Sequence, residues 1–181
     1  MVHLPCCRIV EKMIRILEAV GPGGERDMRR INPDYRAIAC RMANESPYFK
    51  LLSMELKEFE VGESLLEIRL ENKHLQPFGF VHGGVFASII DAAAFWAVFP
   101  DVGEEEGMTT VDLSLNYLAP AVTGTLIARG RRIKMGRTLG LGEAQVLDRD
   151  GRILTHGTST LVAVPGGFGR EQPMPPKFLE D

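Results

Sequence analysis

The chain has 181 residues, of which 45% are hydrophobic and 25% are charged, and its formal net charge at pH 7 is -3. This length and composition fit one globular domain with a hydrophobic core, and they exclude fibrous and disordered classes. A weakly negative chain has no electrostatic reason to bind nucleic acid or an anionic membrane surface, so we expect small-molecule partners.

Cysteine usage and hydropathy indicate the compartment. Cys6 and Cys7 are adjacent and Cys40 stands apart, an odd set that suits neither a disulfide framework nor a CxxC motif. This favours a reducing, cytoplasmic location. The longest apolar run, at 85–99, is interrupted by Asp91 and is shorter than the roughly 20 residues of a membrane helix, so we expect no membrane span.

The sequence predicts three parts. Residues 1–31 form a helical extension, since residues 8–20 show helical amphipathicity and a break rich in Gly and Pro follows at 21–24. Residues 32–165 carry regular patterns and form the working domain. Residues 166–181, with repeated Gly and Pro, are predicted to be an irregular tail.

The working domain opens with a short helix from Pro33 to Asn44, because Pro is favoured at the first helical position. Strands with a period of two follow. In the clearest of them, apolar residues such as Leu113 alternate with polar ones such as Thr110, which predicts that the two sets lie on opposite faces. The expected strands cover residues 52–56, 66–70, 110–117, 125–135, 138–148 and 152–164.

A helix from Gly83 to Phe99 is apolar nearly all round and must therefore be buried. Gly140, Gly142 and Ala144 alternate along one strand, which leaves room for this helix to lie close to the sheet. The predicted fold class is α+β, with one antiparallel sheet curved around one long central helix.

Asp91 is the only charged residue in this helix. Burying an ionised carboxylate without partners is costly, so such groups are more frequent at functional sites than in ordinary cores. The N–H groups of Gly83 and Gly84, at the helix N-terminus, are placed to hold a developing negative charge. Each of these residues also has a structural interpretation. Asp91 can be a structural carboxylate on a polar strip with Ser88, and Gly83 and Gly84 can be positions where the helix packs closely against a neighbour.

Gly83 and Asp91 lie eight residues apart, which is roughly 12 Å along a helix axis. Both groups must come within about 3 Å of the same reacting atoms. If two chains pack their central helices antiparallel about a twofold axis, Gly83 of one chain approaches Asp91 of the other. We therefore predict an obligate homodimer with two equivalent sites.

Several other chemistries are disfavoured. The four histidines are scattered without the spacing of a helical zinc site, so no metal is expected. The sequence has no P-loop, residues 140–142 lack the third glycine of a dinucleotide motif, and residues 157–161 lack the closing glycine of a nucleophile elbow.

Several segments together resemble one family. They are QPFGFVHGG at 76–84 with Asp91 following, VDLSLNYLAP at 111–120, Gly124, GRT at 136–138 and DRDG at 148–151. With them, the chain resembles the hotdog-fold acyl-CoA thioesterases, in particular their phenylacetate-pathway (PaaI-like) branch, over roughly residues 34–164. The resemblance implies a hotdog fold and hydrolysis of an acyl-CoA to the free acid and coenzyme A. It also implies that no cofactor is needed, and that homodimers pair into homotetramers.

By this resemblance, the Gly83 N–H binds the thioester carbonyl and stabilises the oxyanion, a contribution of about 3 kcal/mol. Asp91 then acts as a nucleophile or as a general base, and both options stay open. Thr110 matches a hydroxyl that positions the attacking water. Gln76 stands where the branch usually has Asn, and it keeps the amide donor.

The residues expected to bind substrate are His82, Gly84, Gly136, Arg137 and Thr138. Arg137 is the best candidate to receive the phosphates of coenzyme A, although a solvated strand face explains the basic residues at 131–137 equally well. His82 is interpreted as a structural side chain bonded to nearby backbone. We expect four aromatic residues to lie in the core rather than in an acyl pocket: Phe78, Phe80, Phe95 and Trp96.

Two rival functions remain open. A hotdog hydratase or dehydratase would act on the same thioesters and would need a pair of His and acid at its site. A non-catalytic acyl-CoA-sensing module would use Asp91 as a structural group, since one scaffold can host catalysis or binding.

Overall fold

The computed structural model describes residues 29–166 and 174–179. The predicted helix at 8–20 lies outside these residues. The division into an extension at 1–31, a domain at 32–165 and a tail at 166–181 therefore stays a prediction.

Six antiparallel strands form one sheet in the order β1-β2-β4-β5-β6-β3, so β1 and β3 are the edge strands. The strands are β1 (Met54–Glu60), β2 (Glu63–Arg69), β3 (Glu106–Tyr117), β4 (Thr125–Met135), β5 (Leu139–Leu147) and β6 (Ile153–Pro165). Each strand overlaps the segment predicted for it. Leu52 and Leu70, however, lie just outside β1 and β2.

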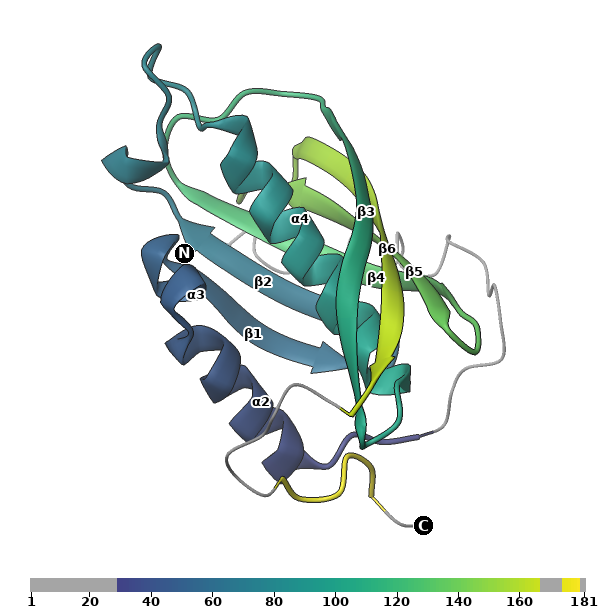
Figure 1. The fold of residues 1–181 in the computed structure, drawn as a ribbon. Helices are drawn as coiled ribbons and strands as arrows, with labels where there is room; N and C mark the ends of the chain where they lie inside the picture. The colour runs from purple at the N-terminus through teal and green to yellow at the C-terminus, as the bar shows by residue number, and fades with distance from the viewer. Residues whose placement is uncertain (1–28, 167–173, 180–181) are drawn as a thin grey trace, which may run out of the picture.

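The central helix α4 (Gly83–Val98) lies against the concave face of the sheet and contacts all six strands (Figure 1). Glycines on the strands permit this close approach, as predicted. A Cβ on Gly142 would lie 2.9 Å from the carbonyl oxygen of Ala94, and a Cβ on Gly130 would overlap the carbonyl oxygen of Ala93. The predicted α+β arrangement is confirmed, and it holds α4 in a fixed position over the sheet.

The helical stretch is longer than the apolar run seen in the sequence, because the 3-10 turn η2 (Phe99–Asp101) continues α4. The stretch Gly83–Asp101 is 19 residues long with a mean hydropathy of 1.5, so length and composition alone would allow it to cross a membrane. Its apolar face packs on the sheet instead, with Ile89, Ile90 and Ala93 fully buried. In the structure it is the core helix of the domain.

Two short helices, α2 (Pro33–Glu45) and α3 (Pro47–Leu51), lie beside the edge strand β1 (Figure 1). The predicted start of α2 is confirmed, and the side chain of Asn32 caps it by accepting the Asp34 N–H at 3.0 Å. Asn44 ties α2 to β1, since its amide bonds both the N–H and the carbonyl of Leu56. Helix α3 is not predicted by the sequence pattern, because five residues are too few to show a helical period.

A β-bulge in β3 corrects one prediction. The pairing of β3 with β6 shifts by one residue between Thr110 and Asp112. Because the extra residue is Val111, the strict alternation is broken there. Thr110 therefore turns toward α4, as Leu113 does, rather than to the opposite face. Val111 is left 58% exposed.

Candidate active site

Asp91 lies in the middle of α4, half-buried, on the face of the helix nearest β3 and β6. Its Oδ1 accepts two hydrogen bonds, from Thr110 Oγ1 at 2.8 Å and from Ser159 Oγ at 3.1 Å. Thr110 is on β3, and Ser159 is fully buried on the neighbouring strand β6. The structure thus brings together two of the predicted site residues, Asp91 and Thr110.

The two oxygens of Asp91 have different surroundings. Both hydroxyl donors converge on Oδ1, whereas no donor within residues 29–166 and 174–179 bonds Oδ2. The polar strip proposed with Ser88 is not formed, because Ser88 bonds Tyr48 and the Gly84 carbonyl instead. Oδ2 therefore keeps its lone pairs available for a proton or for a carbonyl carbon.

The sequence does not predict Ser159 as a site residue. Its segment, 157–161, is considered there only as a nucleophile elbow, and it lacks the closing glycine of that motif. A signal exists in the strand pattern. Ser159 shares a strand face with Gly157 and Leu161, and all three are buried beneath α4. The pairing of β6 with β3 then decides that this hydroxyl reaches Asp91.

The N-terminus of α4 presents one amide without a partner. His82 caps the helix, since its Nδ1 accepts the Gly84 N–H at 2.9 Å, and the Val85 N–H bonds the His82 carbonyl. Among the described residues no acceptor meets the Gly83 N–H. His82 is thus a structural side chain bonded to backbone, as interpreted, and Gly83 offers the free donor expected of an oxyanion site.

Gln76 lies in the tight loop that leads into α4. Its Oε1 accepts the Phe78 N–H at 2.8 Å, and its backbone N–H bonds the Phe80 carbonyl. The amide nitrogen of Gln76 has no acceptor in the described part of the chain. It therefore keeps the donor that the family resemblance assigns to it.

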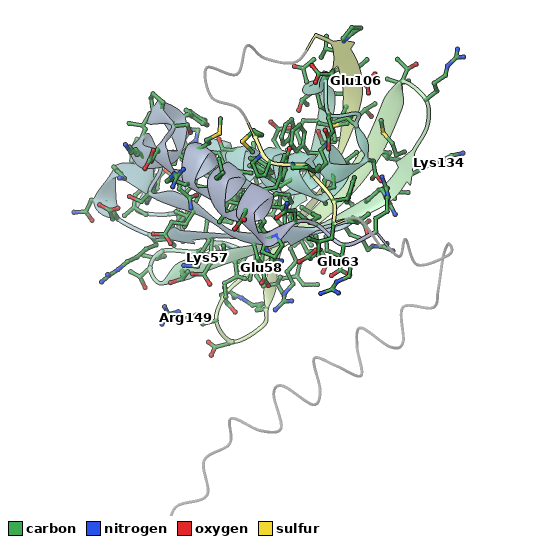
Figure 2. The ribbon with its side chains drawn as sticks, turned by 90° about the horizontal axis from the view of Figure 1, so that it is seen from below. Lys57, Glu58, Glu63, Glu106, Lys134 and Arg149 are labelled. Atoms are coloured by element: carbon green, nitrogen blue, oxygen red, sulfur yellow. The ribbon has the colours of Figure 1, made fainter. Side chains whose placement is uncertain are left out.

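The predicted turn at Gly136, Arg137 and Thr138 joins β4 to β5 at the other end of the helix. Gly140, just beyond this turn, packs against Val98 near the C-terminus of α4. Figure 2 shows Lys134 projecting outward beside this turn. Within one protomer the structure therefore does not bring the turn to Gly83.

The basic residues near this turn differ in their partners. Arg131 pairs with Glu143 at 2.5 Å, and Arg132 pairs with the largely buried Asp101 at 2.5 Å. Arg137 is exposed and forms no ion pair with any described residue. Of these three cations, only Arg137 keeps its charge available for a ligand.

The aromatic residues correct another prediction. Phe78 is 85% exposed and Phe80 is 43% exposed, so neither belongs to the core. Both lie in the loop before α4, which projects beyond the sheet (Figure 1). Phe95 and Trp96 are half-buried, and they line a pocket of about 490 Å³ that also contains Asp91.

Comparison with known proteins identifies the family. The family model of the thioesterase superfamily matches residues 78–155, which include Asp91 and Thr110. An X-ray structure of a protein from the thioesterase superfamily is 30% identical and has a TM-score of 0.64, over 72% of this chain and 98% of that one. The chain belongs to the thioesterase superfamily.

Two further relatives agree with this membership. A thioesterase family protein from Silicibacter pomeroyi is 29% identical with a TM-score of 0.66, over 73% of this chain and 99% of that one. Acyl-coenzyme A thioesterase 13 of Homo sapiens is 25% identical over 55% of this chain and 71% of its own length. The sheet wrapped around α4 is therefore the hotdog fold of thioesterases, as predicted.

Proposed function

We propose that this thioesterase-superfamily protein hydrolyses an acyl-CoA thioester to the free acid and coenzyme A. The observation that carries the proposal is the carboxylate of Asp91, which lines the pocket and is held through Oδ1 by two hydroxyls, while Oδ2 has no hydrogen-bond partner among the described residues. A carboxylate fixed in this way is oriented for proton transfer or attack before the substrate binds. The human relative named as an acyl-coenzyme A thioesterase supports the same substrate class.

The reaction needs an oxyanion donor near Oδ2. Gly83 lies two turns away in the same helix, so we propose that Gly83 of the partner subunit supplies it, with antiparallel central helices about a twofold axis. The edge strand β3 supports this arrangement. Among the described residues no strand pairs with its outer side, and it exposes Val111 and Tyr117, each 58%. The proposed enzyme is a homodimer, which then pairs into a tetramer.

The chemical step follows from these positions. As a general base, Oδ2 takes a proton from water, the water oxygen bonds to the carbonyl carbon, and the C–S bond breaks to release coenzyme A as a thiolate that is then protonated. As a nucleophile, Oδ2 itself bonds to the carbonyl carbon and the C–S bond breaks to release coenzyme A as a thiolate that is then protonated; water later cleaves the anhydride to the free acid and the Asp91 carboxylate. In both routes the carbonyl oxygen is bound by the partner subunit's Gly83 N–H and by the side-chain amide of the partner subunit's Gln76.

The remaining assignments are proposals of the same kind. Arg137 of the protomer that supplies Asp91 would meet a coenzyme A phosphate, because antiparallel helices bring its turn toward the partner subunit's Gly83. We propose that the reaction needs no metal or redox cofactor, that the enzyme belongs to the PaaI-like branch, and that it acts in the cytoplasm. Within one protomer no described histidine bonds Asp91, and His82 is engaged as the cap of α4 through Nδ1, which favours hydrolysis over hydration.

The test is release of free thiol from a panel of acyl-CoAs by the purified chain and by Asp91→Asn. We expect the variant to fold and bind acyl-CoA but to lose at least about 100-fold in kcat, the range of a general base or nucleophile. Asp150→Asn, in an exposed turn, is the matched control. Full activity of Asp91→Asn would refute the proposal, and a folded wild type that binds acyl-CoA without releasing thiol would favour the sensing module.

A further inference from the structure

The pocket beside Asp91 is built by one protomer from α2, α3, α4, β1 and β3. Most of its lining is apolar, from Ala43, Phe49, Met54, Phe95, Trp96 and Leu113. The ring of Trp96 packs against the ring of Phe59, with the ring centroids 5.1 Å apart. The pocket therefore has rigid apolar walls suited to the acyl part of a ligand.

The polar groups of this pocket are mostly engaged with one another. The Tyr48 hydroxyl and Ser88 Oγ lie 2.7 Å apart, and Ser88 also donates to the Gly84 carbonyl at 2.8 Å. The hydrogen bond between Tyr48 and Ser88 ties α3 to α4 within the lining of the pocket. Asp91 is the only charged residue among those lining the described pocket, and the lining contains no cation.

These features decide which acyl groups fit. A carboxylate at the far end of an acyl chain would lose its hydration without gaining a cationic partner, and it would also be repelled by Asp91. An uncharged acyl group of the same length would only remove apolar surface from water. The charge of the lining thus discriminates between acyl groups of the same length.

We infer that the pocket between α3 and α4 is the acyl-binding site and that it selects uncharged, apolar acyl groups against acyl groups that end in a carboxylate. The inference rests on the proposed thioesterase function and adds the substrate class. Asp91 has two roles in it: Oδ2 acts on the thioester, and its negative charge excludes dicarboxylic substrates.

The experiment compares matched pairs of substrates, butyryl-CoA with succinyl-CoA and hexanoyl-CoA with adipyl-CoA, by thiol release. We expect kcat/KM to be roughly 100-fold higher for the uncharged member of each pair, as a lost charge partner predicts. Equal values within a pair, or a preference for the dicarboxylic member, would overturn the inference. If no acyl-CoA releases thiol, the proposed function fails, and calorimetric binding of hexanoyl-CoA and adipyl-CoA then decides the selectivity separately.

A cation placed in the pocket supplies a second test. Ser46 lines the pocket, is half-buried and makes no side-chain cap bond, so Ser46→Arg is compatible with the fold. We expect this variant to raise the ratio of adipyl-CoA to hexanoyl-CoA turnover by about 10-fold, since the guanidinium can pair with the distal carboxylate. Ser46→Gln is the uncharged control. An unchanged ratio in a folded Ser46→Arg protein would place the acyl group elsewhere.

Discussion

The Ser159 hydroxyl donates a 3.1 Å hydrogen bond to Oδ1 of Asp91, joining residues that are 68 positions apart in the sequence. The same hydroxyl also lies 3.3 Å from the Asp112 carbonyl, so it is shared between the helix and the bulged edge strand. Ser159 therefore acts as a positioning residue, which sets the orientation of the carboxylate without touching substrate.

Ser159→Ala should lower kcat by about 10- to 150-fold and leave KM unchanged, because a hydrogen bond to a charged group contributes about 1.5–3 kcal/mol. The measurement is steady-state thiol release together with thermal unfolding. Thr158→Ala, on the opposite face of β6, serves as the control. A rise in KM with kcat unchanged would mean that Ser159 affects binding rather than the orientation of Asp91.

Thr110→Val should act in the same way, since it removes the hydroxyl and keeps the shape, while Thr110→Ser should retain most activity. In the double variant Thr110→Val/Ser159→Ala, the fold-loss in kcat should exceed the product of the two single fold-losses, because either hydroxyl alone still holds Oδ1. A double variant whose loss equals that product would argue against a shared task.

Only the nucleophile route for Asp91 can place water oxygen in the Asp91 side chain. In a single turnover with excess enzyme in H₂¹⁸O, the general-base route places ¹⁸O in the released acid. The nucleophile route leaves ¹⁸O on the Asp91 side chain whenever water attacks the aspartyl carbon of the anhydride. Because Thr110 and Ser159 hold the carboxylate and no described residue donates to Oδ2, we expect the general-base result, with ¹⁸O in the acid and none in the Asp91 side chain. Mass spectrometry of the peptide containing Asp91 tests this, because ¹⁸O in that peptide would overturn the general-base route.

Val111→Glu should convert the dimer to monomer and abolish thiol release together. The side chain is 58% exposed on the edge strand β3, and a charge there opposes pairing with a second copy. Light scattering and activity are measured on the same sample. Glu105→Lys, on the exposed loop before β3, changes charge outside the proposed interface and is the control. An active monomer would contradict the shared site.

Gly130→Ala should destabilise the fold severely, because its Cβ would overlap the Ala93 carbonyl oxygen and Ser64 Oγ, where backbone cannot yield easily. Overpacking costs about 1–3 kcal/mol, which lowers Tm by about 2–12 °C in a chain of this size. Gly103→Ala meets only the end of the Glu106 side chain and should be nearly neutral. Similar melting temperatures for both variants would show that α4 does not press on β4 as described.

Acid stability should depend on Glu143. Burial alone would raise the pKa of this carboxyl, but hydrogen bonds from Arg131 and His156 outweigh burial and hold the pKa below its ordinary 4.5. A lowered pKa in the folded state stabilises the protein above pH 4.5, and this stabilisation is lost as the pH falls through the folded-state pKa. In urea unfolding, wild type should therefore exceed Glu143→Gln in stability at pH 7, and the gap should shrink below pH 4. If the difference in unfolding free energy between wild type and Glu143→Gln stayed constant with pH, the lowered pKa of Glu143 would not contribute to stability.

The sequence by itself determined the strands, the buried helix and the isolated carboxylate, because these depend on local periodicity and on a charge placed among apolar neighbours. It also marked Gly83 and Gly142, since a helix N-terminus and a crowded strand face both leave a local trace. It misplaced Phe78 and Phe80, which are apolar yet lie on an exposed loop. Apolar character alone does not say which elements will cover a residue.

Only the tertiary structure decided which hydroxyls reach Asp91. The bulge at Val111 turns Thr110 inward, and the pairing of β6 with β3 carries Ser159 under the helix. Both depend on strand register, which is set by contacts between segments far apart in the chain and leaves no pattern within either segment. The pocket is decided in the same way, because α3 becomes its wall only once Tyr48 meets Ser88 on α4.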